Sequence, residues 1–316
     1  MSEQIVTLRN SAGHALYCML ELPPPGAPKR DLACVLLSPG VKMRVAPHRM
    51  YRKLAAEFLD RGIAVMRVDF HGLGDSEGDL PEQQLDLLYR QVQLGRHVDD
   101  ARSALRWLER EHGKRRFIIG GLCGGALTGL LASEIDESVA ALYAIGIPVV
   151  LDASGQHESQ TMTQGQLKDM RGSYLAKLLR PSSWMRLLTF QSDFRTILRS
   201  LFPKARVGGS SGKRIADAKV PPPATPTAAN LNPRYPPAFF GLLQRGRPAL
   251  LIFSGADRLQ FEYQEKFVAP WREPLNALAS LLSVEIIPEA NHVLGDPSWM
   301  SQARSLTGRW LDERFR

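Results

Sequence analysis

The sequence contains very little cysteine: three residues, Cys18, Cys34 and Cys123, in a chain of 316. An odd and sparse count argues against a disulfide framework and favours a reducing compartment, so we expect a cytoplasmic location. No apolar run approaches the roughly 18 residues needed to cross a bilayer. The opening MSEQIVTLRN also lacks the apolar core of a signal peptide. The sequence therefore predicts a protein without a transmembrane segment.

Motifs for metals, phosphates and nucleic acids are also missing. No cluster of Cys, His, Asp and Glu has metal-ligand spacing, so we expect no metal and no other cofactor. The stretch GLGDSEG (72–78) is rich in glycine, but it does not follow the G-x-G-x-x-G pattern and no helix pattern opens there. No known nucleic-acid-binding motif accompanies the basic residues, so we expect no nucleic-acid partner.

The net charge of +8 is concentrated in one segment. Residues 160–220 contain twelve Lys and Arg but only three Asp, which gives this segment a charge of +9 and leaves the rest of the chain close to neutral. One interpretation is a solvated face. The other is attraction to an acidic molecule, such as an anionic substrate, an acidic carrier protein or a lipid surface.

Short apolar runs alternate with helical patterns along most of the chain. Strand-like runs, the first two expected to form an antiparallel hairpin, occur at 4–10, 14–22, 32–38, 63–70, 116–121, 139–147, 247–257 and 283–291. Helical patterns occur at 48–62, 84–112, 125–135 and 296–315. Strands that alternate with helices predict an α/β fold with a doubly wound, mostly parallel sheet.

This alternation is interrupted once, from 151 to 247. The first part of the interruption is amphipathic and helical, whereas 203–237 is rich in Pro, Gly and Ala and has almost no large apolar residue. Such a composition cannot offset the entropy of ordering, so we expect a mobile loop there. We predict a core made of 1–150 and 248–316, with 151–247 inserted as a helical cap.

The segment GLCGG (121–125) stands between a strand run and a helix pattern. It fits G-x-Nu-x-G, the nucleophile elbow, with Cys123 where serine is usual. The glycines allow the sharp turn from strand to helix, and a helix N-terminus favours the thiolate, which is the nucleophilic form. The alternative is that Cys123 is a small buried hydrophobic residue.

A nucleophile of this kind needs a base and an acid that orients the base. His292 follows the last strand run, at the carboxyl edge where open α/β sheets place their sites. Asp257 ends the run before it, and the chain order Cys123, Asp257, His292 fits nucleophile, acid, histidine. Asp296 is the alternative acid, although its place before the final helix is more typical of a helix N-cap.

The other candidate side chains read as structural. His71 and Asp75 lie in the turn VDFHGLGDSEG (68–78), which we expect to hold neighbouring loops together. We expect surface positions for three further histidines, His14, His97 and His112. His157 lies in the predicted cap.

An acyl-transfer site also needs donors for the developing oxyanion. The backbone N–H of Gly124, which follows the nucleophile, is the first candidate. The second donor is expected from the loop SPGVKMR (38–44), with Val41 as first choice and Lys42 as the alternative.

Together these residues resemble the α/β-hydrolase superfamily along the whole chain outside the cap. The turn VDFHGLGDSEG is similar to the D-x-x-G-x-G-x-S-x-G turn common there. Three segments, GLCGG, SPGVKMRVAPHR and FQSDFRTILRS, resemble the type 1 exosortase A system-associated hydrolases of bacterial exopolysaccharide clusters, which also carry a cysteine elbow. A looser similarity is to dienelactone hydrolases, which use a Cys-Asp-His triad.

The resemblance implies a hydrolase-like role near polysaccharide or lipid-linked metabolism. It also singles out Arg44 and His48, which would lie near the oxyanion loop and could bind a substrate anion. A salt bridge at the start of a helix is an equally compatible interpretation of these two residues.

A cysteine nucleophile favours activated acyl groups such as thioesters, lactones and aryl or enol esters. We therefore expect a cysteine-dependent hydrolase of an ester or thioester, acting through an acyl-cysteine on a small-molecule or carrier-linked substrate. The acyl-cysteine is itself a thioester that amines and alcohols can intercept, so an acyltransferase with the same triad is an alternative. A catalytically silent accessory or binding protein of a biosynthetic cluster is the third.

Overall fold

A computed structural model of the chain describes residues 2–80, 85–151 and 230–315. These residues belong to one unit of the chain, formed by 1–155 and 228–316. The basic segment and most of the predicted cap, including residues 203–229 of its Pro/Gly/Ala-rich loop, therefore lie outside the described residues. Residues 235–237, predicted as the end of that loop, instead begin the helix Tyr235–Gln244. The boundaries of the cap stay a prediction.

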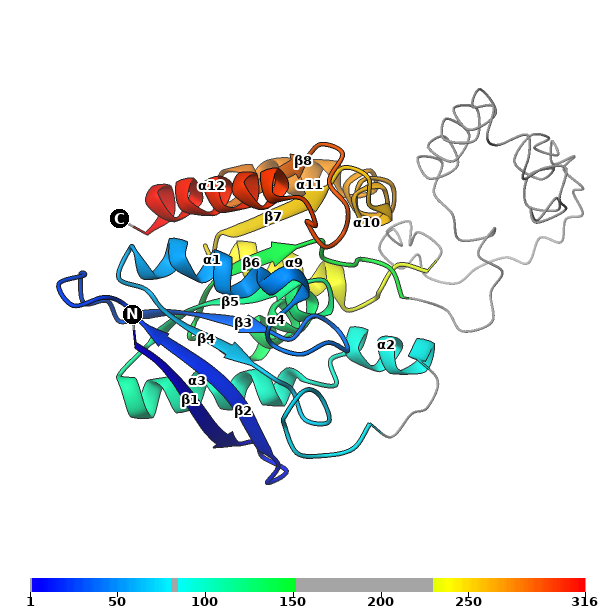
Figure 1. The fold of residues 1–316 in the computed structure, drawn as a ribbon. Helices are drawn as coiled ribbons and strands as arrows, with labels where there is room; N and C mark the ends of the chain where they lie inside the picture. Colours follow the sequence, from blue (N-terminus) through cyan, green and yellow to red (C-terminus); the bar gives the residue numbers. More distant parts are fainter. Residues whose placement is uncertain (1, 81–84, 152–229, 316) are drawn as a thin grey trace, which may run out of the picture. The chain divides into compact units, whose positions relative to one another are not determined.

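The described residues form one eight-stranded sheet with helices on both faces (Figure 1). Its strands are β1 Ser2–Arg9, β2 Ala15–Leu22, β3 Leu32–Leu37, β4 Ala64–Val68, β5 Arg116–Leu122, β6 Val139–Ile145, β7 Ala249–Ser254 and β8 Leu282–Ile287. They are ordered β1-β2-β4-β3-β5-β6-β7-β8. β2 pairs antiparallel with β1 and β4, and the other neighbouring pairs are parallel. The predicted entry hairpin and mostly parallel sheet are confirmed.

The helices divide between the two faces of the sheet. Their bounds are α1 Met50–Leu59, α2 Leu85–Gln93, α3 Val98–His112, α4 Gly124–Ile135, α9 Tyr235–Gln244, α10 Arg258–Glu262, α11 Arg272–Ala277 and α12 Pro297–Arg314, with the π-helix η2 Tyr263–Val268 and the short 3-10 turns η1 Pro47–Arg49 and η3 Ala279–Leu281. One apolar core joins α1 and α12 to the sheet, and the other joins α3, α4 and α9. Within the described part, no helix has the length and apolar character to cross a membrane.

The central strand β3 shows why this sheet is buried on both sides. All six of its residues are buried. Cys34 and Leu36 pack in the core of α1 and α12, whereas Val35 and Leu37 pack in the core of α3, α4 and α9. A continuous apolar run is what a strand covered by helices on both faces requires.

The prediction of one helix over 84–112 is wrong. The structure has two helices there, α2 and α3, separated at 94–97. Gly95 adopts φ = 100°, and a Cβ at this position would lie 2.6 Å from Nη1 of Arg234. The helical periodicity continues across the break, so only the glycine signals it.

The chain leaves and re-enters the described core at one place. Val150 forms an antiparallel bridge with Leu231, and the N–H of Leu151 donates to the carbonyl of Asn230 at 2.9 Å. The helix α9 that follows, although inside the predicted cap limits, packs against α4. Residues 151 and 230 are therefore immediate neighbours on the core.

Candidate active site

Cys123 lies at the turn between β5 and α4, where the sequence places the elbow. It has φ = 54° and ψ = −119°, a backbone conformation that L-residues rarely adopt and that costs on the order of 1–3 kcal/mol. Its N–H donates to the carbonyl of Ile145 at 2.8 Å, which ties the turn to the end of β6. The side chain is half-buried, whereas Cys18 and Cys34 are fully buried, and burial raises the pKa of both of those thiols.

The three glycines of GLCGG are each required by a close contact. A Cβ at Gly121 would lie 2.3 Å from the hydroxyl of Tyr51, and one at Gly125 would lie 2.4 Å from the carbonyl oxygen of Leu37. A Cβ at Gly124 would lie 2.7 Å from Cα of Gly40. The glycines therefore allow the loop after β3 to pack directly against the elbow.

Tyr51 on α1 links the elbow to the end of β3. Its hydroxyl donates to the carbonyl of Leu37 at 2.7 Å and accepts a hydrogen bond from the N–H of Leu122 at 2.7 Å. The side chain is completely buried, so both bonds are shielded from water. Sequence reasoning missed Tyr51, which looks like any other apolar position of an amphipathic helix.

Asp257 and His292 come together at the carboxyl edge of β7 and β8. Nδ1 of His292 donates to Oδ2 of Asp257 at 2.6 Å. The loops that carry them are joined by backbone bonds, including one from Ala256 N–H to the carbonyl of Ala290 at 3.1 Å. Gly146, after β6, leaves room for the imidazole, because a Cβ there would lie 3.4 Å from Cε1 of His292.

Two opposing effects determine the protonation of His292. Burial lowers the pKa of the imidazole, but its hydrogen bonds with Asp257 and Cys123, and the charges of both, raise this pKa to about 10. Because Nδ1 is bonded to Asp257, the nitrogen that faces Cys123 is Nε2. The imidazolium is thus the stable form at neutral pH.

The alternative acid, Asp296, has another role. Its carboxylate accepts a hydrogen bond from the N–H of Ser298 at 2.8 Å and caps the N-terminus of α12, as expected. A hydrogen bond from Oγ of Ser298, at 2.6 Å, is the main cause that lowers the pKa of this exposed carboxyl group, and the backbone bond adds to it.

The loop after β3 contains both candidates for the second oxyanion donor. The N–H of Lys42 donates to the carbonyl of Pro39 at 3.1 Å. The N–H of Val41 has no hydrogen-bond acceptor among the described residues. Since Gly40 packs against Gly124, this loop lies beside the first candidate donor.

Arg44 and His48, predicted near this loop, differ in their surroundings. The Arg44 guanidinium pairs with Asp69 and with Asp75, the latter at 2.8 Å, and its side chain is 12% exposed. The structure thus contains the salt-bridge alternative, and a substrate contact by Arg44 stays a prediction. His48 has φ = 54°, and its Nε2 lies 3.6 Å from where a Cβ of Gly295 would stand, so it borders the loop of His292.

His97 is buried, contrary to the predicted surface position. It stacks on Phe70 with ring centroids 4.5 Å apart, and its Nδ1 lies 3.5 Å from Oδ2 of Asp100. Burial is the main cause that lowers the pKa of this imidazole. The sequence prediction failed because the break between α2 and α3 turns this position inward.

His71, His97 and Asp100 bring their potential metal-ligand atoms within 4.8 Å of one another, the group of this kind found in the described part of the chain. The Asp100 carboxylate already accepts bonds from the N–H and Nδ1 of His71, at 2.8 and 2.7 Å, and from Asn10 at 2.7 Å. We therefore interpret His71 and Asp100 as a hydrogen-bonded pair that joins the turn after β4 to α3, in line with the structural role predicted for His71.

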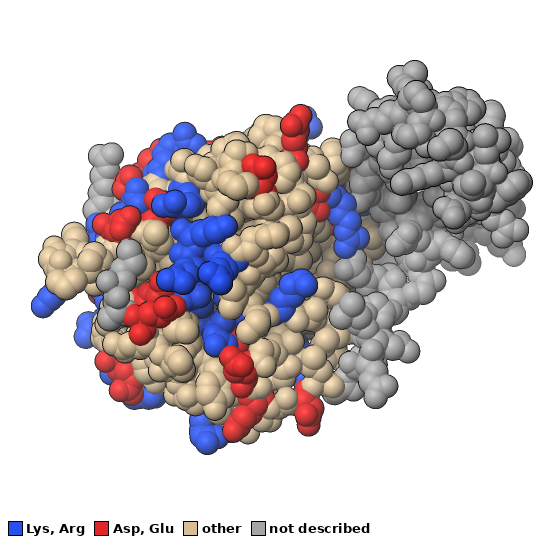
Figure 2. Space-filling model, in the orientation of Figure 1, with Lys and Arg blue, Asp and Glu red and all other residues tan. Residues whose placement is uncertain are grey.

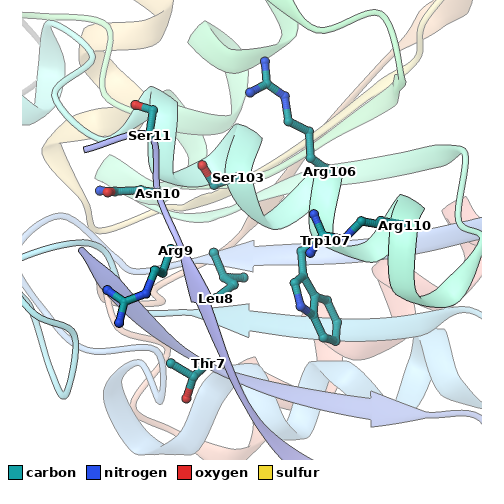
Figure 3. Close-up of a pocket in the computed structure, with 9 residues that line it drawn as sticks. All are labelled: Thr7, Leu8, Arg9, Asn10, Ser11, Ser103, Arg106, Trp107 and Arg110. Carbon is teal, nitrogen blue, oxygen red and sulfur yellow. The ribbon is translucent and has the colours of Figure 1, made fainter. Parts of the chain in front are cut away.

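A separate cavity of about 490 Å³ lies between β1 and α3, on residues other than those around Cys123 (Figure 3). Arg9, Arg106 and Arg110 line it with Trp107, but Figure 3 shows the guanidinium groups of Arg9 and Arg106 pointing apart. They do not converge on one anion. The face of the molecule seen in Figure 2 carries acidic and basic side chains side by side, consistent with a charge excess confined to 160–220.

The sequence matches the model of one protein family. Residues 34–303 fit the alpha/beta hydrolase family, which is most of the chain. A comparison with curated protein sequences gave no match.

Solved structures with the same fold include several hydrolases. An esterase from Pyrococcus furiosus is 15% identical, with a TM-score of 0.56, over 100% of this chain and 94% of that chain. A dienelactone hydrolase from Anabaena variabilis is 16% identical, with a TM-score of 0.51, over 100% and 99%. A hypothetical protein from Pseudomonas aeruginosa is 16% identical, with a TM-score of 0.58, over 99% and 94%. At these identities the likeness concerns the fold.

Proposed function

Since the chain belongs to the alpha/beta hydrolase family, we propose that it hydrolyses an ester or thioester with Cys123 as nucleophile, His292 as acid and base, and Asp257 as the orienting carboxylate. The observation that carries the proposal is the strained backbone of Cys123 beside a His292–Asp257 pair joined at 2.6 Å. Backbone strain at a single residue persists where the surrounding contacts over-determine it, and such residues cluster at active sites.

The first half of the reaction forms an acyl-cysteine. The Cys123 thiolate, stabilised by the His292 imidazolium and the N-terminus of α4, attacks the carbonyl carbon. The carbonyl oxygen becomes an oxyanion that accepts hydrogen bonds from the N–H groups of Gly124 and Val41. The tetrahedral intermediate then expels the alcohol or thiol, which takes its proton from Nε2 of His292.

The second half restores the enzyme. The imidazole of His292, now neutral, accepts a proton from water, and the resulting hydroxide attacks the acyl-cysteine. The same N–H groups stabilise the second oxyanion, the acid is released, and Cys123 leaves as a thiolate beside the imidazolium. Asp257 keeps the ring oriented through Nδ1 in both halves. An amine or alcohol in place of water would give acyl transfer.

Intact-mass analysis tests this proposal directly. The protein is incubated with p-nitrophenyl acetate or with acyl thioesters, the reaction is quenched in acid, and the intact mass is measured by mass spectrometry. Wild type should gain the mass of one acyl group on Cys123, and Cys123→Ala should gain none. Acylation of the Ala variant at the same rate would refute the assignment. Adding an amine or alcohol acceptor then shows whether the acyl group goes to water or to the acceptor.

The finer identity of the substrate rests on the sequence alone. The similarity to exosortase-associated hydrolases and the charge of +9 in 160–220 favour an anionic, carrier-linked or glycan-linked acyl donor. Electrostatic attraction weakens with salt, because the Debye length falls from about 30 Å at 0.01 M to about 10 Å at 0.1 M. The kcat/KM for an anionic thioester should therefore fall as salt rises, whereas that for a neutral ester stays level. An equal response of both would favour a neutral substrate.

A further inference from the structure

The turn after β4 contains a buried carboxylate that binds the loop after β3. Because β3 and β4 are parallel neighbours, their carboxyl ends place both loops at the same edge of the sheet. Asp69, directly after β4, is fully buried. It accepts hydrogen bonds from Oγ of Ser38 at 3.2 Å, the N–H of Asp75 at 3.3 Å, and both the N–H and the guanidinium of Arg44. We call these four residues the Asp69 clamp.

Both ends of the short segment that carries Val41 are fixed to this one carboxylate. Ser38 binds it at the start of the segment, and Arg44 binds it at the end. The N–H of Ser38 also donates to the carbonyl of Val68 at 3.2 Å, and its hydroxyl shares its single proton between that carbonyl, at 2.8 Å, and the carboxylate of Asp69. The segment is therefore a closed loop whose two ends share one anchor.

The surroundings of the carboxylate are arranged for this contact. The Arg44 guanidinium lies between Asp69 and Asp75, so its nearly buried charge is paired on two sides. A Cβ at Gly74 would lie 2.1 Å from Oδ2 of Asp69, so a glycine is required there. The glycine-rich turn that sequence analysis assigned only a structural role thus encloses one carboxylate that faces the neighbouring loop.

Resting on the proposed function, we infer that Asp69 and Arg44 are positioning residues that hold the Val41 N–H at the oxyanion. Oxyanion donors act only when they are fixed where the charge develops, and a displacement of about 1 Å at such a site can cost about 100-fold in rate. Two hydrogen-bonded anchors prevent that displacement. Packing of Gly40 against Gly124 then determines the distance between the loop and the elbow.

Two reactions of the same thiolate separate this role from a general effect on the fold. Acylation by p-nitrophenyl acetate passes through an oxyanion and needs the Val41 N–H. Alkylation by iodoacetamide is a displacement at a saturated carbon: the sulfur–carbon bond forms as iodide leaves, and no oxyanion develops. A displaced loop should therefore slow acylation and leave alkylation unchanged.

The variants are Asp69→Asn, which removes the charge, and Arg44→Lys, which keeps the charge but loses the fork of donors. We expect acylation to slow by about 10- to 100-fold, since complete removal of one oxyanion donor costs about 100- to 1000-fold. Alkylation should change less than about twofold. Arg67→Lys is the matched control, because Arg67 is also buried between two carboxylates, but these are Glu3 on β1 and Glu21 on β2.

The outcomes distinguish this inference from the proposed function. If wild type is not acylated at Cys123, the proposed function fails and this inference fails with it. If acylation and alkylation fall together in the clamp variants, or acylation stays at the wild-type rate in a folded variant, this inference alone is refuted. If Asp69→Asn does not fold by circular dichroism, Arg44→Lys decides between these results.

Discussion

The three cysteines occupy very different surroundings. Cys18 and Cys34 are completely buried in strands, where a thiolate would be desolvated, and burial raises the pKa of both thiols. Cys123 is half-buried, at a helix N-terminus and in contact with an imidazolium. Thiolate character and access together determine how fast a cysteine reacts.

We therefore predict that iodoacetamide labels Cys123 at least about 100-fold faster than the two buried cysteines at pH 7. Peptide mapping by mass spectrometry after timed exposure measures the three rates in one sample. His292→Ala removes the adjacent positive charge and should slow labelling of Cys123 only. Similar rates at all three cysteines would contradict the proposed ion pair.

The raised pKa of His292 predicts the alkaline limit of the reaction. A histidine ordinarily titrates near 6.5, but here the imidazolium persists until pH rises through about 10. Since the imidazolium supplies the proton to the leaving group in the proposed mechanism, acylation by an unactivated thioester should be level through neutral pH and fall as pH passes about 10.

The check is the pH profile of the acylation rate for wild type and for Asp257→Asn. Loss of the Asp257 charge and hydrogen bond lowers the pKa of His292, so the alkaline fall should move to lower pH. We expect the rate at pH 7 to drop by about 10⁴-fold, as when a triad aspartate is replaced by asparagine. A larger effect from Asp296→Asn would show that the wrong acid was chosen.

At the scale of elements, the elbow depends on a close approach between β3, β5 and α4. Gly125 allows the first turn of α4 to contact the carbonyl of Leu37, and Tyr51 joins that same carbonyl to Leu122. A methyl group at Gly125 must move backbone atoms of β3, because no flexible side chain is there to yield.

We predict that Gly125→Ala destabilises the protein by about 1–3 kcal/mol, the range for overpacking a core. Gly241→Ala is the matched control, because it lies within helix α9 with no atom within 4 Å of the added methyl group. That control should gain about 0.5–1 kcal/mol from helix propensity. Urea unfolding followed by circular dichroism measures both, and a neutral Gly125→Ala would contradict the contact.

The sequence predicts the helices and strands better than the breaks between them. The eight strands follow from apolar runs, and the elbow follows from five residues whose types and spacing are fixed by local sterics. The break at Gly95 was missed, because one glycine inside a continuing helical period is weak evidence against a helix. His97 was misplaced for the same reason.

The residues that support the candidate site were harder to find than its reactive groups. The reactive residue types of the candidate site, Cys123, Asp257 and His292, can be recognised in the sequence. The structure brings Asp257 and His292 into contact. Tyr51 and Gly146 act through contacts between segments far apart in the chain, for which a single sequence holds no signal. Asp69 is the first residue of the D-x-x-G-x-G-x-S-x-G pattern, which the sequence shows. The groups that its carboxylate binds are seen only in the structure, where the two loops pack together.

At the scale of the whole molecule, the described core closes on itself without residues 152–229. Leu151 and Asn230 are hydrogen-bonded at 2.9 Å, and Val150 and Leu231 belong to the core of α3, α4 and α9. A chain that leaves and returns at adjacent points adds little to the constraints on the core.

We predict that replacing 152–229 with a short Gly-Ser linker gives a protein that folds and unfolds cooperatively. Thermal denaturation followed by circular dichroism is the measurement. A longer deletion, 152–244, also removes α9, which packs on α4 and buries Tyr235 and Phe239, and it should not fold. If the shorter deletion is equally insoluble, the core needs the inserted segment.

The conformation of Cys123 also limits how this site can change in evolution. Serine and cysteine differ by one nucleotide in their codons and tolerate φ = 54° equally, so serine can replace Cys123 at the elbow without any backbone movement. Threonine also carries a hydroxyl, but a β-branched side chain is a genuine outlier at positive φ. The conformation of the turn thus permits exchange between cysteine and serine at position 123 but disfavours threonine, whatever the substrate is.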